Sequence, residues 1–134
     1  MPSPVELVRP AELSSHAPYA YAAVAGAYVF TAGACPLDAE GTTVAVGDVS
    51  GQARQVMANL VAALRAAGAE LTDVVKTTVY VASPHRADLV SAWDVVRSTF
   101  GDHDAPSTLL GVTVLGYPDQ LVEVEAVAVR PGER

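Results

Sequence analysis

Two segments of the chain carry apolar residues at helical spacing. Between 47 and 68 these positions recur every three or four residues and form one stripe: Ala53, Val56, Met57, Leu60, Val61 and Leu64. Asp48 or Ser50 suits the N-cap of this helix and Gly68 suits its end. A second stripe lies between 83 and 101: Leu89, Val90, Trp93, Val96 and Phe100. We therefore predict two amphipathic helices, over 47–68 and 83–101, the second opening with Ser83 as N-cap and Pro84 at its first position.

Four segments have the pattern of strands. Residues 28–33 and 73–81 are rich in β-branched and aromatic side chains. Residues 107–115 and 121–129 have the same character and are joined by the turn-rich sequence GYPDQ. Helices and strands in this order predict an α+β domain in which both helices cover one face of a mixed sheet, since nothing else can bury their apolar stripes.

The other face of that sheet is left uncovered. Alternation along 121–129 gives it a mixture of apolar and acidic side chains: Leu121, Glu123, Glu125, Val127 and Val129. A half-apolar face of this kind favours a partner surface, and a symmetric oligomer supplies one. We therefore expect self-association, with sites between subunits.

Composition narrows the class of protein. A chain of 134 residues that is 51% hydrophobic and 17% charged predicts one packed domain, 1–134. Eight basic against fifteen acidic residues give a formal charge of −7 without any Lys/Arg run, which argues against a nucleic-acid partner. There is no apolar stretch long enough to span a membrane and no signal-like start, so we expect a cytoplasmic protein. With a single cysteine and no metal-ligand spacing, neither an intrachain disulfide nor a metal site is expected.

Several stretches together resemble one family, the Rid (RidA/YjgF) enamine/imine deaminases. The matching pieces are APYAYAAVAGAYVFTAGACPLD (17–38), GDVSGQARQVMANLVAALRAAGAELTDVVKTTVYV (47–81), FG (100–101) followed by APST (105–108), and LVEVEAVAV (121–129). The resemblance implies a chorismate-mutase-like α+β fold and a homotrimer with small-molecule clefts between subunits. For a typical member it also implies cofactor-free hydrolysis of 2-imino or 2-enamino acids to 2-oxo acids and ammonia.

The chain departs from the family pattern where substrate is held. The typical A-R-S motif is Ala105-Pro106-Ser107 here, and the missing arginine would grip the substrate carboxylate. Proline offers neither a charge nor an N–H donor, and only arginine presents a planar two-donor fork. A helix asparagine that commonly faces the cleft is Trp93. We therefore expect 2-aminoacrylate to be a poor substrate, and a less anionic, more apolar one to be favoured.

The resemblance carries Tyr19, Gly33, Ser107 and Glu125 into the cleft. Glu125 is the candidate proton carrier, or else a strand carboxylate paired across the interface. Tyr19 would orient substrate or water, or else pack with its hydroxyl bonded to the backbone. The alternative function is a non-catalytic protein that binds a small ligand on the same scaffold.

Four further residues are assigned to the site, and two arginines are weighed as replacements for the missing one. Trp93 is either core or a stacking wall for a flat ligand, and Pro106 borders the same cleft. Cys35 is a packed thiol or, with a base nearby, a nucleophile. His103, flanked by two aspartates, either lines the cleft or is solvated. Arg97, or Arg86, either replaces the missing arginine or is simply solvated.

Overall fold

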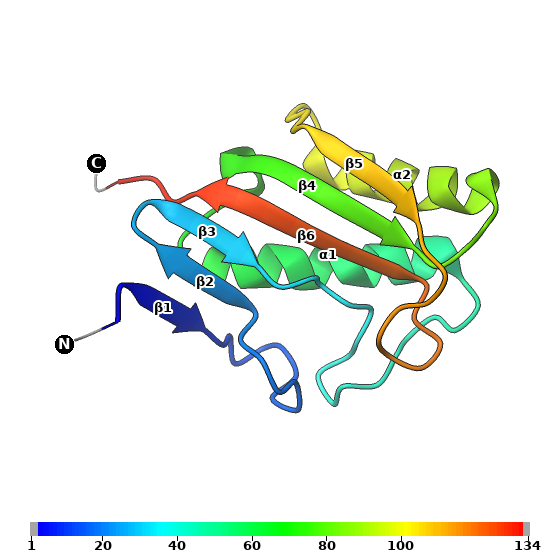
Figure 1. Cartoon of the computed structure of the whole chain (residues 1–134), viewed down its shortest axis with the longest axis horizontal. Coiled ribbons are helices and arrows are strands. Elements are labelled where there is room, and N and C mark those ends of the chain that lie inside the picture. The colour runs from blue at the N-terminus through cyan, green and yellow to red at the C-terminus, as the bar shows by residue number, and fades with distance from the viewer. Residues whose placement is uncertain (1–2, 133–134) are drawn as a thin grey trace.

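A six-stranded mixed sheet with two helices on one face forms the structure, a computed structural model that describes residues 3–132 (Figure 1). The strands are β1 (Val5–Val8), β2 (Ala22–Ala25), β3 (Tyr28–Thr31), β4 (Val74–Val81), β5 (Ser107–Gly111) and β6 (Val122–Val129). The helices are α1 (Val49–Ala66), α2 (Arg86–Phe100) and the short 3₁₀ helix η1 (Leu71–Asp73). This confirms the predicted α+β class, with both helices on the same face.

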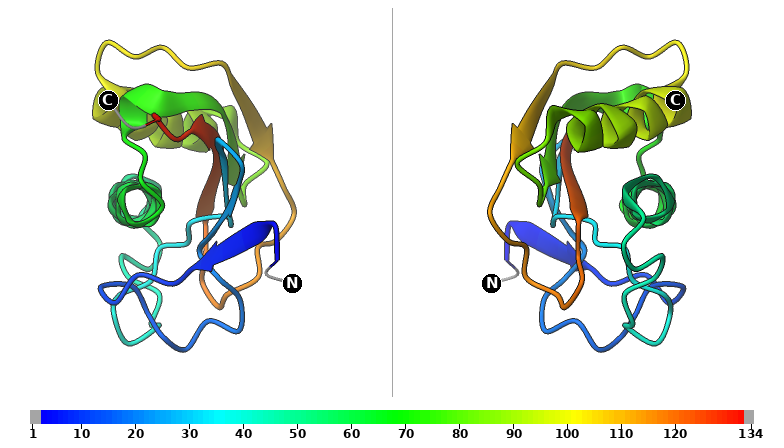
Figure 2. Two further views of the ribbon diagram at one scale, coloured as in Figure 1. Left: turned by 90° about the vertical axis from the view of Figure 1, so that its left-hand side faces the viewer. Right: turned by 90° about the vertical axis from the view of Figure 1, so that its right-hand side faces the viewer.

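The strand order β1-β2-β3-β6-β4-β5 explains why both helices share a face. All neighbouring strands are antiparallel except β4 and β5. Since β3 and β4 both run antiparallel to β6, they are parallel to each other, and α1 is the crossover between them. The second helix, α2, is the crossover from β4 to β5. Both crossovers advance in the same direction across the sheet, so a common right-handed connection puts both helices on one side (Figure 2).

The apolar stripe of α1 supplies most of the helical core. Ala53, Val56, Met57, Leu60 and Leu64 are buried against the inward side chains of the central strands, as the spacing predicted. The N-cap is Asp48, one of the two predicted, because its Oδ1 accepts from the Gly51 amide at 2.9 Å. At the other end Ala67 is the C-cap, and the predicted Gly68 follows it with a φ of +89°. Val61 is only half-buried, and Ala63 takes its place in the stripe. In α2 the buried positions are Ala92 and Val96, whereas Val90 is 54% exposed.

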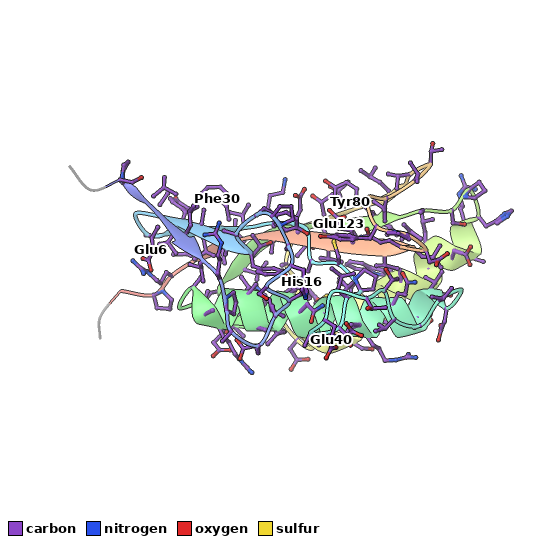
Figure 3. The ribbon with its side chains drawn as sticks, turned by 90° about the horizontal axis from the view of Figure 1, so that it is seen from below. Glu6, His16, Phe30, Glu40, Tyr80 and Glu123 are labelled. Carbon is purple, nitrogen blue, oxygen red and sulfur yellow. The ribbon has the colours of Figure 1, made fainter. Side chains whose placement is uncertain are left out.

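The face of the sheet away from the helices is open and largely apolar at one end. Leu7, Tyr28 and Phe30 expose 58%, 52% and 47% of their surface, and Phe30 and Tyr80 project on the side opposite α1 (Figure 3). The rings of Tyr28 and Phe30 lie 6.4 Å apart. Leu121, predicted to share this face, instead precedes β6 and packs half-buried against the core. Its amide donates to Gln52 Oε1 at 2.7 Å, which draws the chain toward α1.

The start of the second helix, the end of one strand and two further strands differ from the sequence prediction. The helix α2 begins at Arg86 with His85 as N-cap, because the Ser83 hydroxyl is used by the His85 amide at 3.0 Å and by Asp88 at 2.6 Å. The strand predicted over 107–115 ends at Gly111. The strands β1 and β2 were not predicted at all. No helix within residues 3–132 is both long and apolar enough to cross a membrane.

Candidate functional site

The segment after β3 folds back onto β6 and brings distant residues together. The Ala34 amide donates to the Val124 carbonyl at 2.7 Å, and the Val124 amide returns a bond to Ala34 at 3.2 Å. From α1, the Asn59 amide holds the same segment by donating to the carbonyls of Cys35 at 2.8 Å and Leu37 at 2.9 Å. The backbone between 33 and 37 is therefore fixed between the sheet and the helix.

This arrangement places Glu123 over Gly33. A Cβ added at Gly33 would occupy the space of the Glu123 carboxylate, so a larger residue there would displace that side chain from its present position. Glu123 Oε1 accepts from the Gln120 side-chain amide at 3.1 Å and from the Cys35 thiol at 3.6 Å, and the Gly33 carbonyl at 3.3 Å is the alternative acceptor for the one thiol proton. Oε2 has no hydrogen-bond partner among residues 3–132, so only one carboxylate oxygen is held within the subunit.

Tyr19 joins the same group through the loop before β6. Its hydroxyl lies 2.8 Å from the Tyr117 hydroxyl, and either can donate. The Tyr117 amide in turn donates to Gln120 Oε1 at 3.0 Å. A small hollow beside this network is lined by residues of the N-terminal segment, the β3–α1 segment and α1, among them Tyr19, Tyr21, Gly33, Cys35, Gln55 and Asn59. We name the connected set Tyr19, Gly33, Cys35, Tyr117, Gln120 and Glu123 the Glu123 network.

Burial is the main reason that the pKa values of the Cys35 thiol and the Tyr19 phenol are raised. Burial, followed by the negative charge of Glu123, raises the pKa of Cys35 to about 12. Burial and the bond to Tyr117 raise the pKa of Tyr19 far above its usual value. Because the thiolate is the nucleophilic form of cysteine, Cys35 is a donor to Glu123 rather than a nucleophile at neutral pH.

Trp93 and His103 form a second group, under α2. Both line a hollow of about 250 Å³ whose other lining residues are Thr77, Val96, Arg97, Phe100, Asp104 and Ala105. The ring of His103 bonds through Nε2 to the Val74 carbonyl at 2.8 Å, so this histidine is fixed to the start of β4. Trp93 is half-buried and packs against the core as well as lining the hollow.

Pro106 and Ser107 adjoin this second group at the start of β5. The Pro106 carbonyl accepts from the Thr77 amide at 2.9 Å, and the hydroxyl of Thr77 lies 2.7 Å from that of Ser107. The proline ring itself is exposed. The segment therefore offers a hydroxyl and an exposed pyrrolidine, with no cation at position 106.

Glu125 lies on the same face of β6 as Glu123, two residues further along the strand, but outside the hydrogen bonds of the Glu123 network. Its Oε1 accepts from the Tyr80 hydroxyl at 2.6 Å, and this bond is the main reason that the pKa of Tyr80 rises to about 12. Tyr80 and Glu123 appear on the same side of the sheet in Figure 3.

Comparison with known proteins identifies the family. Residues 9–130 match the family described as Endoribonuclease L-PSP, which is most of the chain. This chain belongs to that family, the Rid (RidA/YjgF) proteins. The resemblance read from the sequence is thereby confirmed.

Curated relatives and solved structures agree with this assignment. A RutC family protein of Pyrococcus horikoshii is 36% identical over 113 residues, which cover 84% of this chain and 87% of the relative. The 2-iminobutanoate/2-iminopropanoate deaminase of Salmonella typhimurium is 38% identical over 115 residues, 84% and 88% of the two chains. The crystal structure of Escherichia coli TdcF with bound serine superposes with a TM-score of 0.81 at 29% identity, covering 94% of this chain and 99% of TdcF.

The site residues expected of this Rid protein thus fall into three places within one subunit. Tyr19, Gly33 and Cys35 meet in the Glu123 network; Trp93, His103, Pro106 and Ser107 surround or adjoin the α2 hollow; and Glu125 is on the open face. That these places meet across a subunit boundary stays a prediction. Within residues 3–132 there is no cluster of three or more His, Cys, Asp and Glu side chains suited to a metal ion.

Sequence reasoning missed Glu123, Gln120, Tyr117 and Asn59. Glu123 and Glu125 are two residues apart on one strand, so both point to the same face and alternation cannot distinguish them. Gln120 and Tyr117 lie in the segment GYPDQ, for which the sequence predicted a turn but no role in a site. The side-chain amide of Asn59 donates to backbone carbonyls that are far away in sequence. No local pattern in the sequence predicts such a contact.

Proposed function

We propose that this Rid protein is an imine or enamine hydrolase whose substrate is less anionic and more apolar than 2-aminoacrylate. The observation that carries the proposal is the Glu123 carboxylate, with Oε1 held by Cys35 and Gln120 and Oε2 unpaired. Support for the reaction class comes from the relative named as a 2-iminobutanoate/2-iminopropanoate deaminase. Support for the altered substrate comes from Pro106, which offers no cation.

The reaction needs one group that moves protons. Water adds to the carbon of the C=N bond and one of its protons passes to nitrogen. The second proton then passes from the new hydroxyl to nitrogen as the C–N bond breaks, which leaves a carbonyl compound and ammonia. A carboxylate with one free oxygen can take the proton from water and return it to nitrogen. In this proposal Glu123 has that role, and the protonated Tyr19 hydroxyl orients the water or the substrate nitrogen.

We further propose that the working unit is a homotrimer with its clefts between subunits. The exposed side chains of Leu7, Tyr28 and Phe30 support burial of the open sheet face. In such an assembly the Glu123 network of one subunit would face the Pro106 edge of another, which no single subunit achieves.

The test compares imines that carry a carboxylate with imines that do not. A flavin-dependent amino acid oxidase generates 2-imino acids in situ, a flavin-dependent amine oxidase generates imines without a carboxylate, and ammonia release is followed with and without this protein. Acceleration with the uncharged, apolar imines and little with 2-aminoacrylate is the expected result. Equal acceleration of 2-aminoacrylate would overturn the proposed substrate preference.

Two matched variants test the proton carrier. Glu123→Gln should lower the rate by about 10²–10⁴-fold, the usual contribution of a positioned acid or base. Glu125→Gln removes a carboxylate from the same strand and face, and should change the rate only a few-fold. If Glu125→Gln lowered the rate more than Glu123→Gln, the role of proton carrier would belong to Glu125. No acceleration of any imine, with ligand binding retained, would instead favour the non-catalytic binding protein.

A further inference from the structure

The loop that leads into β6, residues 117–121, carries two side chains of the Glu123 network. The side-chain amide of Gln120 donates to Glu123 Oε1 at 3.1 Å, and the Tyr117 hydroxyl lies 2.8 Å from that of Tyr19. Within the loop, the Tyr117 amide donates to Gln120 Oε1 at 3.0 Å, so a shift of the loop would move both side chains together. The position of the 117–121 loop therefore determines where the Glu123 carboxylate and the Tyr19 hydroxyl lie.

A buried side chain of α1 holds the backbone of this loop. Gln52 is 0% exposed, its Oε1 accepts from the Leu121 amide at 2.7 Å, and its Nε2 donates to the Asp119 carbonyl at 2.9 Å. The same Nε2 lies 3.4 Å from the Ala45 carbonyl, so both donors of the amide are used. Residues 119 and 121 flank Gln120 in the sequence. Gln52 therefore fixes the backbone on both sides of the residue that holds the Glu123 carboxylate.

The loop needs this support because of its backbone conformation. Asp119 has a φ of +60°, a left-handed conformation that residues other than glycine seldom adopt. A second anchor lies on the exposed side of the loop, where the Thr43 hydroxyl donates to the Pro118 carbonyl at 2.8 Å. Without the Gln52 amide, the loop would stay attached at Pro118 but would lose its fixed conformation next to Gln120.

We propose that Gln52 is a positioning residue for the Glu123 carboxylate and acts through the 117–121 loop. Within residues 3–132 Gln52 makes no hydrogen bond to Glu123 itself, so its effect passes through Gln120. A misplacement of a reacting group by about 1 Å can cost a hundredfold in rate. The inference rests on the proposed role of Glu123 as proton carrier, but the placement of the carboxylate can be measured without turnover.

The test replaces the amide by an apolar side chain of similar length, Gln52→Met, and uses two readouts. One is ammonia release from the imines, and the other is the pH midpoint for alkylation of Cys35 by iodoacetamide, because this thiol contacts Glu123. In Gln52→Met we expect kcat to fall by roughly ten- to hundredfold, with a smaller change in KM. The Cys35 midpoint should fall, because the displaced carboxylate no longer places its charge beside the thiol.

A core variant separates positioning from a general loss of stability. Val56 is fully buried on the same helix, and Val56→Ala should lower the stability while both readouts stay at the parent values. A second control adds Gln52→Met to Glu123→Gln, in which the negative charge is already absent. The Cys35 midpoint should then stay where Glu123→Gln alone puts it. Equal effects of Val56→Ala and Gln52→Met, or a further shift in the double variant, would contradict the proposal.

A milder variant serves if Gln52→Met does not fold. Asparagine is one methylene shorter, so Gln52→Asn cannot reach both Asp119 and Leu121 and should give smaller changes of the same kind in both readouts. A folded Gln52→Met or Gln52→Asn protein with the parent's rate and midpoint would overturn the proposal. If the parent hydrolyses no imine, the proposed function fails, and the alkylation of Cys35 still decides whether Gln52 places the carboxylate.

Discussion

The thiol of Cys35 donates to Glu123 Oε1 across 3.6 Å, and this contact couples a cysteine to the carboxylate on which the proposed chemistry depends. The negative charge of Glu123 is the second cause, after burial, of the raised pKa of Cys35. The titration of Cys35 therefore reports on the charge of Glu123. Because the chain has a single cysteine, the reaction of this thiol can be followed without interference from others.

Alkylation of Cys35 by iodoacetamide should be slow and should depend on pH with a midpoint near 12, against an ordinary value of 9.0. Near pH 9 the rate should be at least about a hundredfold below that of a free thiol, because the thiolate is the reacting form. Glu123→Gln should move the midpoint down by removing the nearby negative charge. An unchanged midpoint in that variant would mean that burial alone holds the thiol protonated.

The same pKa predicts how stability changes with pH. The folded state keeps the proton on Cys35 after the unfolded chain has lost it, so its contribution is full below about pH 9 and is lost as pH rises toward 12. The free energy of unfolding measured in urea should therefore fall over that range. In Cys35→Ala the fall should be smaller; an identical fall would show that other groups, such as the tyrosines, dominate it.

Gly33→Ala should disturb the Glu123 network. The new Cβ would take the place of the Glu123 carboxylate, so that side chain must move, at a cost of about 1–3 kcal/mol in the free energy of unfolding. The rate of imine hydrolysis should fall along with the stability. Gly116→Ala is the control, because nothing lies within 4 Å of a Cβ there and its backbone angle suits alanine. Urea unfolding and the ammonia assay check both variants.

Phe30→Glu should break the proposed trimer. A charge placed on the open apolar face has no partner there and would have to be buried on assembly. Light scattering at micromolar concentration should give the trimer mass for the parent and a monomer for Phe30→Glu. Val114→Glu, at a residue that is 76% exposed in the loop before β6, carries the same charge outside the sheet and should remain trimeric. A parent that is already monomeric would contradict the assembly.

Leu60→Ala should lower the free energy of unfolding by roughly 2–5 kcal/mol, because Leu60 is fully buried in the centre of α1. Val90→Ala, also in a helix, should change it by less than about 0.5 kcal/mol, since Val90 is 54% exposed. Urea unfolding measures both. Similar losses would mean that the open side of α2 is covered in solution.

The sequence predicted the long elements because their periodicity is strong. The helix α1 and the strand β4 are 18 and 8 residues long, and each has a continuous pattern. The strands β1 and β2 are four residues each, and β2 reads AAVA, which carries almost no β-branched signal. They are stabilised instead by pairing with each other and with β3, a long-range effect that a local pattern does not contain.

For the candidate site, the family resemblance located Tyr19, Gly33 and Ser107, but the choice between Glu123 and Glu125 depended on tertiary contact. Only the bridge from Ala34 to Val124 brings the Gly33 segment beside Glu123. Glu125 instead accepts from Tyr80 on the neighbouring strand β4, a diagonal contact, because the register pairs Tyr80 with Glu123 and Thr78 with Glu125. The two carboxylates therefore differ in their side-chain partners, which depend on how the whole sheet and the segment after β3 are placed.

The central position of β6 has a consequence for how the chain is made. This strand follows all the others in sequence, yet it lies between β3 and β4 and is the only link between the two halves of the sheet. While a ribosome is still synthesising residues 122–129, the β1–β3 and β4–β5 halves share no backbone ladder and the apolar stripe of α1 has no central strand to cover. The nascent chain therefore keeps this apolar surface exposed until residues 122–129 are free to pair, so closure of the sheet is a late step in folding.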